Sequence, residues 1–273
     1  MKRLSTYLNE KLVVNKNYNP YTRAPKSWNE LKNIIEDRYN ELGVGTEQNP
    51  IDFNDIDVSN IDSFYNGLKG IFEGTKFEYI DISDWNVSKV ENMHNMFYGC
   101  TNLKSICDLS DWNVSKVKAM DYMFFDCINL KSVGDLSEWD VSNVEWTHSM
   151  FCKCFNLKSI GDLSGWNVSN VKSMYSMFDK CKKLESVGDL SKWDVSHVVD
   201  MRYMFERCEE LKSVGDLSKW NVSGVKYMSN MFDGCKKLIS VGDLSKWDVS
   251  YVKYMISIFA NSGITNIPSW YKK

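Results

Sequence analysis

Eight cysteines are the residues of this 273-residue chain best suited to metal binding or disulfide formation. Six of them recur every 27 residues, at Cys100, Cys127, Cys154, Cys181, Cys208 and Cys235. If each interval is one layer of a stack, their side chains run parallel with Cβ atoms about 4.8 Å apart, whereas a disulfide needs about 3.8 Å. We therefore expect buried thiols that act as small hydrophobic side chains. Cys152 lies two residues from Cys154, but with only His148 in addition no metal site is expected.

Asp-Leu-Ser triplets recur in the same register and could form a ladder of calcium ligands. Their aspartates are Asp108, Asp135, Asp162, Asp189, Asp216 and Asp243. Calcium requires six to eight oxygens, and each repeat offers one carboxylate and one hydroxyl, so we expect each aspartate to cap its own turn instead. Asn-Val-Ser triplets match glycosylation acceptors, yet Asp140, Asp194 and Asp248 fill the same position in other repeats. That position is therefore interpreted as a turn that needs a short acceptor side chain.

Catalysis needs a nucleophile, a base and an orienting group that converge at one place, and a repeat disfavours such a unique site. His94, His148 and His197 are interpreted as exposed residues at variable positions. The sequence contains no glycine-rich phosphate loop and no HExxH or GxSxG motif. We predict a protein that is not an enzyme and binds neither a cofactor nor a metal.

Tryptophan recurs with the same 27-residue period, which is typical of a stacked repeat architecture. The row comprises Trp85, Trp112, Trp139, Trp166, Trp193, Trp220 and Trp247, and we expect it to be structural. Within a repeat, apolar residues from Val198 to Leu211 are spaced by three or one, which favours a short helix. The following LKSVGDLS predicts a short strand stacked in parallel on its neighbours. The fold class is therefore an α/β repeat solenoid of about seven to eight rungs over residues 51–273, with a truncated last rung.

Residues 1–50 are expected to form an N-terminal capping region. Ser27 and Glu30 predict a capping box, an amphipathic stripe follows, and Gly43 supplies a helix stop. The open end of a solenoid exposes an apolar rung that such a helix can cover. At the other end, Pro268 removes a backbone donor from the terminal edge.

Composition restricts the partners. A net charge of −3 and a pI near 5.7 give no general affinity for nucleic acid. No apolar run approaches the roughly 18 residues of a membrane span, and the first sixteen residues do not form a secretory signal. We expect no membrane insertion, and a cytoplasmic or virion-associated location rather than secretion.

Exposed aromatic residues in a line are typical of protein-binding surfaces. The candidates beside the predicted helical stripe are Tyr122, Trp146, Tyr175, Tyr203, Tyr227 and Tyr254. Alternatively, these rings only cover the outer face. We predict a non-enzymatic, protein-binding, adhesin-like repeat module with an unknown protein partner. The other candidates are a carbohydrate-binding module that uses the aromatic row and a structural virion component.

Two charged rows add to the candidate surface. A basic row comprises Lys104, Lys131, Lys158 and Lys212, with Glu185 and Ile239 interrupting it. Like charges about 5 Å apart repel, so this row is solvated or faces an acidic partner. A second row changes sign along the chain, through Asp84, Asp111, Glu138, Gly165, Lys192, Lys219 and Lys246. This reversal permits self-association, either head-to-tail or antiparallel.

The repeat signature MFxxCxxLxSVGDLSxW[DN]VSxVxxM resembles the repeats of BspA-like leucine-rich-repeat surface proteins, in particular the tryptophan-containing variant of mycoplasma lipoproteins. The matching positions include Met204, Phe205, Cys208, Leu211, Val214, Asp216, Trp220 and Val222. The resemblance covers residues 51–270 and implies a right-handed, leucine-rich-repeat-like solenoid that acts in adhesion or protein binding. Unlike those surface proteins, this sequence shows no signal peptide or lipidation cysteine, and in this respect it is similar to repeat proteins of large phages of gut bacteria.

Overall fold

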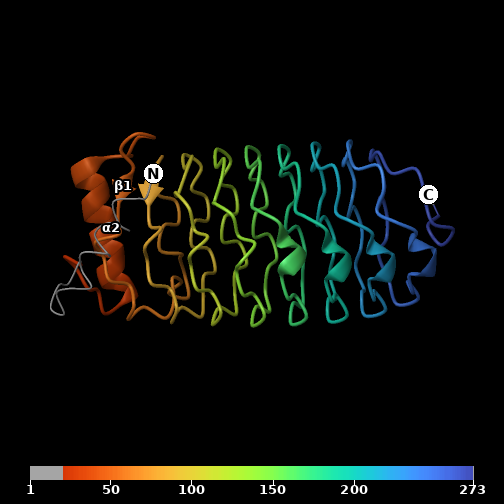
Figure 1. The fold of residues 1–273 in the computed structure, drawn as a ribbon, viewed down its shortest axis with the longest axis horizontal. Helices are drawn as coiled ribbons and strands as arrows, with labels where there is room; N and C mark the ends of the chain where they lie inside the picture. The colour runs from red at the N-terminus through yellow and green to blue at the C-terminus, as the bar shows by residue number, and fades with distance from the viewer. Residues whose placement is uncertain (1–20, 273) are drawn as a thin grey trace.

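The computed structural model describes residues 21–272 and shows an elongated stack of similar rungs (Figure 1). Helix α2 (Trp28–Leu42) lies at one end of the stack, and the C-terminal segment lies at the other. The chain advances rung by rung from one end to the other. The repeat solenoid predicted from the 27-residue spacing is confirmed. The first sixteen residues, in which we expect no secretory signal, lie outside the described residues.

Regular strands are sparse in this stack. Strand β1 (Ile51–Asp52) pairs in parallel with β2 (Ile80–Asp81). Further along, isolated parallel bridges join residues 27 positions apart, such as Ser105 with Ser132. Parallel stacking is therefore confirmed, but the predicted strand in LKSVGDLS shrinks to at most one bridged residue per rung. The chain bends directly afterwards, at a glycine such as Gly134 with φ of 88°.

The short helix predicted in each rung is wrong. Residues 201–211 form consecutive turns, in which Tyr203 and Arg207 have φ of 59° and 55°, outside the right-handed helical region. The amide of Tyr203 donates to the carbonyl of Ser229 in the next rung at 3.0 Å. An amide that bonds across rungs cannot also close the bond to residue i−4 that defines an α-helix. Contact with the neighbouring rung therefore replaces local helical hydrogen bonding.

Each aspartate of the Asp-Leu-Ser triplets caps its own turn, as predicted, and four of these turns are 3₁₀ turns. The turns are η1 (Leu163–Gly165), η2 (Leu190–Lys192), η3 (Leu217–Lys219) and η4 (Leu244–Lys246). In η2, Oδ1 of Asp189 accepts from the amide of Ser191 at 2.9 Å, and these hydrogen bonds hold the pKa of Asp189 below its ordinary value. The Asn-Val-Ser position behaves similarly, since Oδ1 of Asn221 accepts from the amide of Ser223 at 3.2 Å.

Rows of identical side chains fill the core. Phe178 and Phe205 stack with centroids 5.4 Å apart, and Trp166 and Trp193 stack at 6.5 Å. The indole spacing exceeds the roughly 5 Å expected for adjacent strands, but the structural role of the tryptophan row is confirmed. All eight cysteines are free thiols, seven of them buried. The thiol of Cys208 donates to the carbonyl of Phe178 at 3.1 Å, so the row also links rungs.

Helix α2 covers the N-terminal end of the stack and has the predicted caps. The amide of Glu30 donates to the hydroxyl of Ser27 at 3.3 Å. The Glu30 carboxylate accepts from the amide of Lys26 rather than from Ser27, so only one half of the capping box forms. Gly43 ends the helix with φ of 77°. Leu31 and Ile35 are buried in the core, while the division of the chain at residue 50 stays a prediction.

Candidate functional site

The six aromatic residues predicted as one binding row occupy three columns of the repeat. Trp146, Tyr227 and Tyr254 lie in the bridged column, Tyr175 lies two positions later, and Tyr122 and Tyr203 lie three positions later. These columns belong to the same stretch of turns, so the rings lie on the same side of the solenoid. We call this surface the aromatic face. Its ring contacts form two groups. The Tyr122 group comprises Tyr122, Trp146 and the neighbouring His148. The Tyr227 group comprises Tyr175, Tyr203, Tyr227 and Tyr254 with Arg202.

The Tyr122 group surrounds a buried carboxylate. Oδ2 of Asp121 contacts Nδ1 of His94 and lies 3.6 Å from Nε2 of His148. The ring of Tyr122 meets the His148 ring edge-on at 4.8 Å, and Trp146 meets the same imidazole at 6.3 Å. Burial lowers the pKa of His148 while Asp121 opposes this effect, so the neutral imidazole is favoured.

The interpretation of the histidines as exposed is therefore wrong for two of the three. His94 and His148 are half-buried, and His197 is exposed. His94, Asp121 and His148 are spaced by 27 residues, so the repeat period itself places them in one column. That spacing is the signal that the sequence interpretation missed.

The Tyr227 group is organised by an arginine. The guanidinium carbon of Arg202 lies 5.2 Å from the ring centroid of Tyr175 and 4.7 Å from that of Tyr227. The Asp200 carboxylate holds the guanidinium by an ion pair of 2.6 Å, and this pairing raises the pKa of Arg202. Sequence reasoning missed Arg202, although it lies 27 residues after Tyr175.

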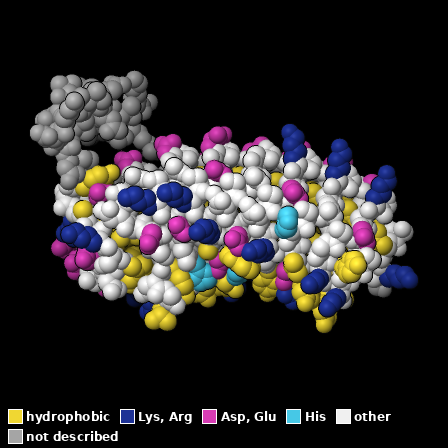
Figure 2. Space-filling view, turned by 90° about the horizontal axis from the view of Figure 1, so that it is seen from below, with side chains coloured by type: hydrophobic (Ala, Val, Ile, Leu, Met, Phe, Trp, Pro, Cys, Tyr) yellow, Lys and Arg dark blue, Asp and Glu magenta, His cyan; other side chains and the backbone are white. Residues whose placement is uncertain are grey.

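Two further rings extend the Tyr227 group. Tyr203 meets Tyr175 edge-on at 5.7 Å, and Tyr254 stacks on Tyr227 at 5.7 Å. Tyr254 is 58% exposed and Trp146 is 41% exposed, whereas the other four aromatic rings are half-buried. Hydrophobic and histidine side chains gather along one edge of the molecule, at the bottom of Figure 2.

The predicted lysine row is partly neutralised. Lys104 pairs with Glu78 and Lys212 pairs with Glu185, each at 2.6 Å. Lys131 and Lys158 are exposed and form no ion pair with residues 21–272. The column of Lys104 lies about half a repeat away from the bridged column of Trp146, and no described contact joins the lysine row to the aromatic face. The two predicted surfaces are thus separate.

The second charged row, whose charge changes from negative to positive along the chain, is exposed at each of its positions. Acidic members are Asp84, Asp111 and Glu138, and basic members are Lys192, Lys219 and Lys246. Figure 2 likewise shows acidic side chains on the upper edge toward the N-terminal helix and basic ones toward the other end. A second copy could meet this edge in antiparallel orientation, and self-association stays a prediction.

The side chains gathered on these surfaces are suited to packing and hydrogen bonding. Within residues 21–272, no three His, Cys, Asp or Glu side chains are arranged to hold a metal ion. The one α-helix in that range is too short and too polar to cross a bilayer. Aromatic rings, a fixed guanidinium and paired charges are groups that bind other molecules by packing and hydrogen bonding.

These features define a repeat solenoid that presents side chains on a regular frame. The chain belongs to the DUF285 family, described as "Mycoplasma protein of unknown function", which matches residues 66–187 and 155–270. This match confirms the mycoplasma-type repeat, while kinship with BspA-like surface proteins stays a prediction. A comparison with curated proteins finds no significant match.

Three solved structures of leucine-rich repeat proteins are similar to this chain. The protein from Eubacterium ventriosum has 16% identity and a TM-score of 0.41, over 80% of this chain and 78% of that one. The protein from T. pallidum has 16% identity and a TM-score of 0.31, over 76% and 82% of the two chains. The protein from Bacteroides ovatus has 13% identity and a TM-score of 0.19, over 73% and 80%.

Proposed function

We propose that the chain is a protein-binding module whose contact surface is centred on the Tyr227 group. The observation that carries this proposal is the position of Arg202, which lies against both Tyr175 and Tyr227. Tyrosine and arginine dominate the binding energy of many protein interfaces. A guanidinium already fixed by Asp200 loses little conformational entropy when a partner binds.

Residues around the Tyr227 group extend the surface toward the C-terminal end. Val199 and Tyr251 are exposed apolar side chains, and Lys226 and Lys253 are exposed beside the bridged column. A basic rim around apolar contacts complements a partner surface that is apolar at its centre and acidic at its edge. An adhesin-like role is one form of this proposal, with the partner on another cell.

Carbohydrate binding receives less support from the same geometry. Sugar rings stack on free aromatic faces, but one guanidinium lies over the rings of Tyr175 and Tyr227. Lys172 similarly places its ammonium 5.4 Å from the ring centroid of Trp146. Cationic side chains of the chain itself therefore already contact the aromatic rings that a sugar ring would stack on.

A capture experiment with matched variants tests the proposal. Immobilised wild-type chain, an Arg202→Ala/Tyr227→Ala variant and a control Lys158→Ala/Ile239→Ala variant are exposed to extract from the native source, and retained proteins are quantified by mass spectrometry. Loss of a hot spot of about 2 kcal/mol lowers affinity about 30-fold, so the partner is expected to be lost from the first variant and kept by the control. Equal capture by both variants, or loss from the control alone, contradicts the proposal.

Two parallel measurements separate the alternatives. A glycan array on which the wild type gives a signal that Tyr227→Ala abolishes would reassign the aromatic face to carbohydrate. Finding the chain as a stoichiometric component of purified virus particles would instead favour the structural role.

A further inference from the structure

In most regular rungs, four peptide groups point along the axis of the solenoid with their N–H groups toward the C-terminal end; the rung that begins at Thr147 has three. The penultimate rung shows the arrangement, with donor–acceptor distances of 2.8–2.9 Å. The donors are the amides of Met228, Asn230, Phe232 and Gly234, and the acceptors are the carbonyls of Tyr254, Ile256, Ile258 and Ala260. Each acceptor carbonyl shares a peptide group with the next residue's amide, so each row continues as a chain of aligned dipoles.

These chains end at an open edge in the last rung. The corresponding amides belong to Met255, Ser257, Phe259 and Asn261, and none has an acceptor among residues 21–272. The edge therefore presents four backbone donors on alternate residues. At these four peptide groups it presents donors only, because their carbonyls point back into the penultimate rung; one backbone acceptor, the carbonyl of Lys253, flanks them. As at the N-terminus of a helix, the free N–H ends of aligned peptides carry partial positive charge.

The opposite end of the solenoid is closed. The ammonium of Lys32 in α2 donates to the carbonyl of Ile71 at 3.0 Å, and the indole of Trp28 donates to the carbonyl of Phe64 at 3.2 Å. Burial lowers the pKa of Lys32 while Glu36 opposes the effect. A cationic donor thus satisfies the carbonyl end of one row of aligned peptide groups, whereas the N–H ends of the four rows have no acceptor among residues 21–272.

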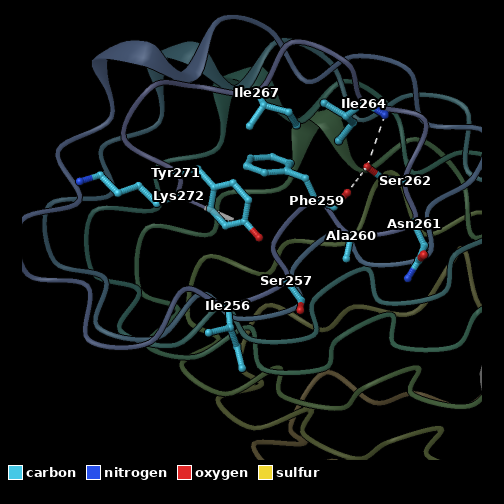
Figure 3. Close-up of a pocket in the computed structure, with 10 residues that line it drawn as sticks. All are labelled: Ile256, Ser257, Phe259, Ala260, Asn261, Ser262, Ile264, Ile267, Tyr271 and Lys272. Carbon is cyan, nitrogen blue, oxygen red and sulfur yellow. Dashed lines mark hydrogen bonds between the residues drawn. The ribbon is translucent and has the colours of Figure 1, made fainter.

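An apolar pocket lies beside the free amides. Its volume is about 590 Å³, within the size range of ligand-binding pockets, and Figure 3 shows the rings of Phe259 and Tyr271 on one side of it and Ile256 on another. Ile256 is 71% exposed. Elsewhere at this end, Trp270 stacks on Trp247 at 6.2 Å and donates to the carbonyl of Leu244. The ring of Phe259 is also packed, against Tyr271 at 5.3 Å, but no hydrogen-bond acceptor among residues 21–272 caps the four amides.

We propose that this edge binds an extended polypeptide segment of another protein, which adds one further rung by offering backbone carbonyls to the four amides and an apolar side chain to the pocket. Addition of a segment to an unpaired backbone edge is an established mode of peptide recognition. A second copy of this chain does not fit, since its own C-terminal end also offers donors and its N-terminal end is covered by α2. A small anion would leave the apolar pocket unfilled.

The chain contains its own example of a segment with the required geometry. Residues 225–234, VKYMSNMFDG, present carbonyls on alternate residues to the rung before them. A synthetic peptide of this sequence is therefore a suitable probe. Because recognition is through the backbone, the probe needs only this conformation and an apolar side chain, and not the sequence of the natural partner.

Hydrogen exchange and binding measurements test the proposal. In the free protein, the amides of Met255, Ser257, Phe259 and Asn261 should exchange quickly, and saturating peptide should slow them at least tenfold. Ile256→Asp should weaken peptide binding at least tenfold in isothermal titration calorimetry. Ile239→Asp is the matched control, since Ile239 is also 71% exposed but lies in the lysine row, and it should bind as the wild type does. Arg202→Ala should also keep peptide binding, which distinguishes this edge from the aromatic face.

Several results would overturn the proposal. One is slow hydrogen exchange of the four amides in the free protein. Another is exchange of these amides that does not slow at peptide concentrations up to the millimolar range. Equal weakening by Ile256→Asp and Ile239→Asp would remove the pocket from the binding site. Protection by inorganic phosphate alone would assign the edge to anions, and protection that rises with protein concentration in the absence of peptide would assign it to a second copy.

Discussion

The indole nitrogen of Trp193 donates a hydrogen bond of 2.9 Å to the carbonyl oxygen of Leu163, which lies 30 positions earlier in the preceding rung. The same carbonyl accepts a second hydrogen bond, from the amide of Trp166 at 3.0 Å. The relationship recurs along the solenoid, from Trp85 with Phe53 to Trp247 with Leu217. Each tryptophan of the row thus joins two rungs by ring stacking and by a directed polar contact.

Replacing this indole by a phenyl ring should destabilise the solenoid. Trp193→Phe removes one of the two donors to a buried carbonyl and leaves part of the ring volume empty, at a cost of about 1–2 kcal/mol. The midpoint of urea unfolding, followed by far-ultraviolet circular dichroism, should fall. Tyr251→Phe, at a position that is 70% exposed, should leave the midpoint unchanged. A Trp193→Phe midpoint equal to that of the wild type would mean that the hydrogen bond contributes nothing.

The glycine at which a rung bends should tolerate no side chain. Gly188 has φ of 84°, and a Cβ there would overlap Oδ1 of Asp162 in the preceding rung. Gly188→Ala should therefore lower the melting temperature and cost more than about 1 kcal/mol. Cys107 occupies the equivalent position with φ of 60°, and its thiol forms a hydrogen bond with Asp81. Cys107→Gly relieves backbone strain of about 1 kcal/mol but loses this bond, so it should lower the melting temperature less than Gly188→Ala in differential scanning calorimetry, and a larger loss would contradict the explanation.

The buried thiols should resist alkylation in the native protein. Burial raises the pKa of Cys152 and of Cys235 to about 12, and burial likewise raises the pKa of Cys208. Little thiolate is then present at about pH 8, and the thiolate is the reactive form. Iodoacetamide followed by peptide mass spectrometry should modify Cys107, which is partly exposed, and should reach Cys152, Cys208 and Cys235 only after unfolding. Rapid labelling of Cys208 in the folded chain would contradict the structure.

A buried aspartate should make stability depend on pH. Burial raises the pKa of Asp179, while the ion pair of 3.0 Å with Lys180 opposes the effect, and its Oδ1 has no hydrogen-bond partner among the described residues. A carboxyl group whose folded-state pKa is raised stabilises the fold most below its ordinary pKa, and this contribution is lost as pH rises through the folded-state pKa. Asp179→Asn should therefore be more stable than the wild type at pH 7, by an amount on the order of 1 kcal/mol. The difference should shrink toward pH 4.

Urea unfolding of the wild type and Asp179→Asn at pH 4, 5.5 and 7 measures this dependence. Asp233→Asn is a suitable control, because Asp233 lies two repeats later in the same column and is only half-buried. An Asp179→Asn variant that is less stable than the wild type at pH 7 would show that the Lys180 ion pair outweighs the cost of burial.

Most framework positions could be predicted from spacing alone. The 27-residue period places Trp193 and Cys208 in buried rows, and the Asp-Leu-Ser triplet predicts the capped turn at Asp189. The capping helix followed from Ser27 and Gly43. These features depend on contacts between equivalent residues or within one turn, so a repeated sequence contains all the information that they require.

The helix predicted in each rung failed for a physical reason. Apolar residues three positions apart, such as Met201 and Met204, occur both in amphipathic helices and in a series of turns that bury every third side chain. The periodicity cannot distinguish the two conformations. The choice depends on where the amides bond, and the amide of Tyr203 bonds to Ser229 in the next rung.

The sequence by itself thus determined the repeat, its buried rows, its turn residues and its N-terminal cap, because these depend on periodicity and local chemistry. Only the tertiary structure decided which variable residues meet, since Arg202 joins Tyr175 to Tyr227 through contacts that cross columns and rungs. It alone also revealed the free amides of the last rung. Their lack of acceptors among the described residues depends on the direction of every peptide group along the stack, which is a property of the assembled backbone and of no single residue.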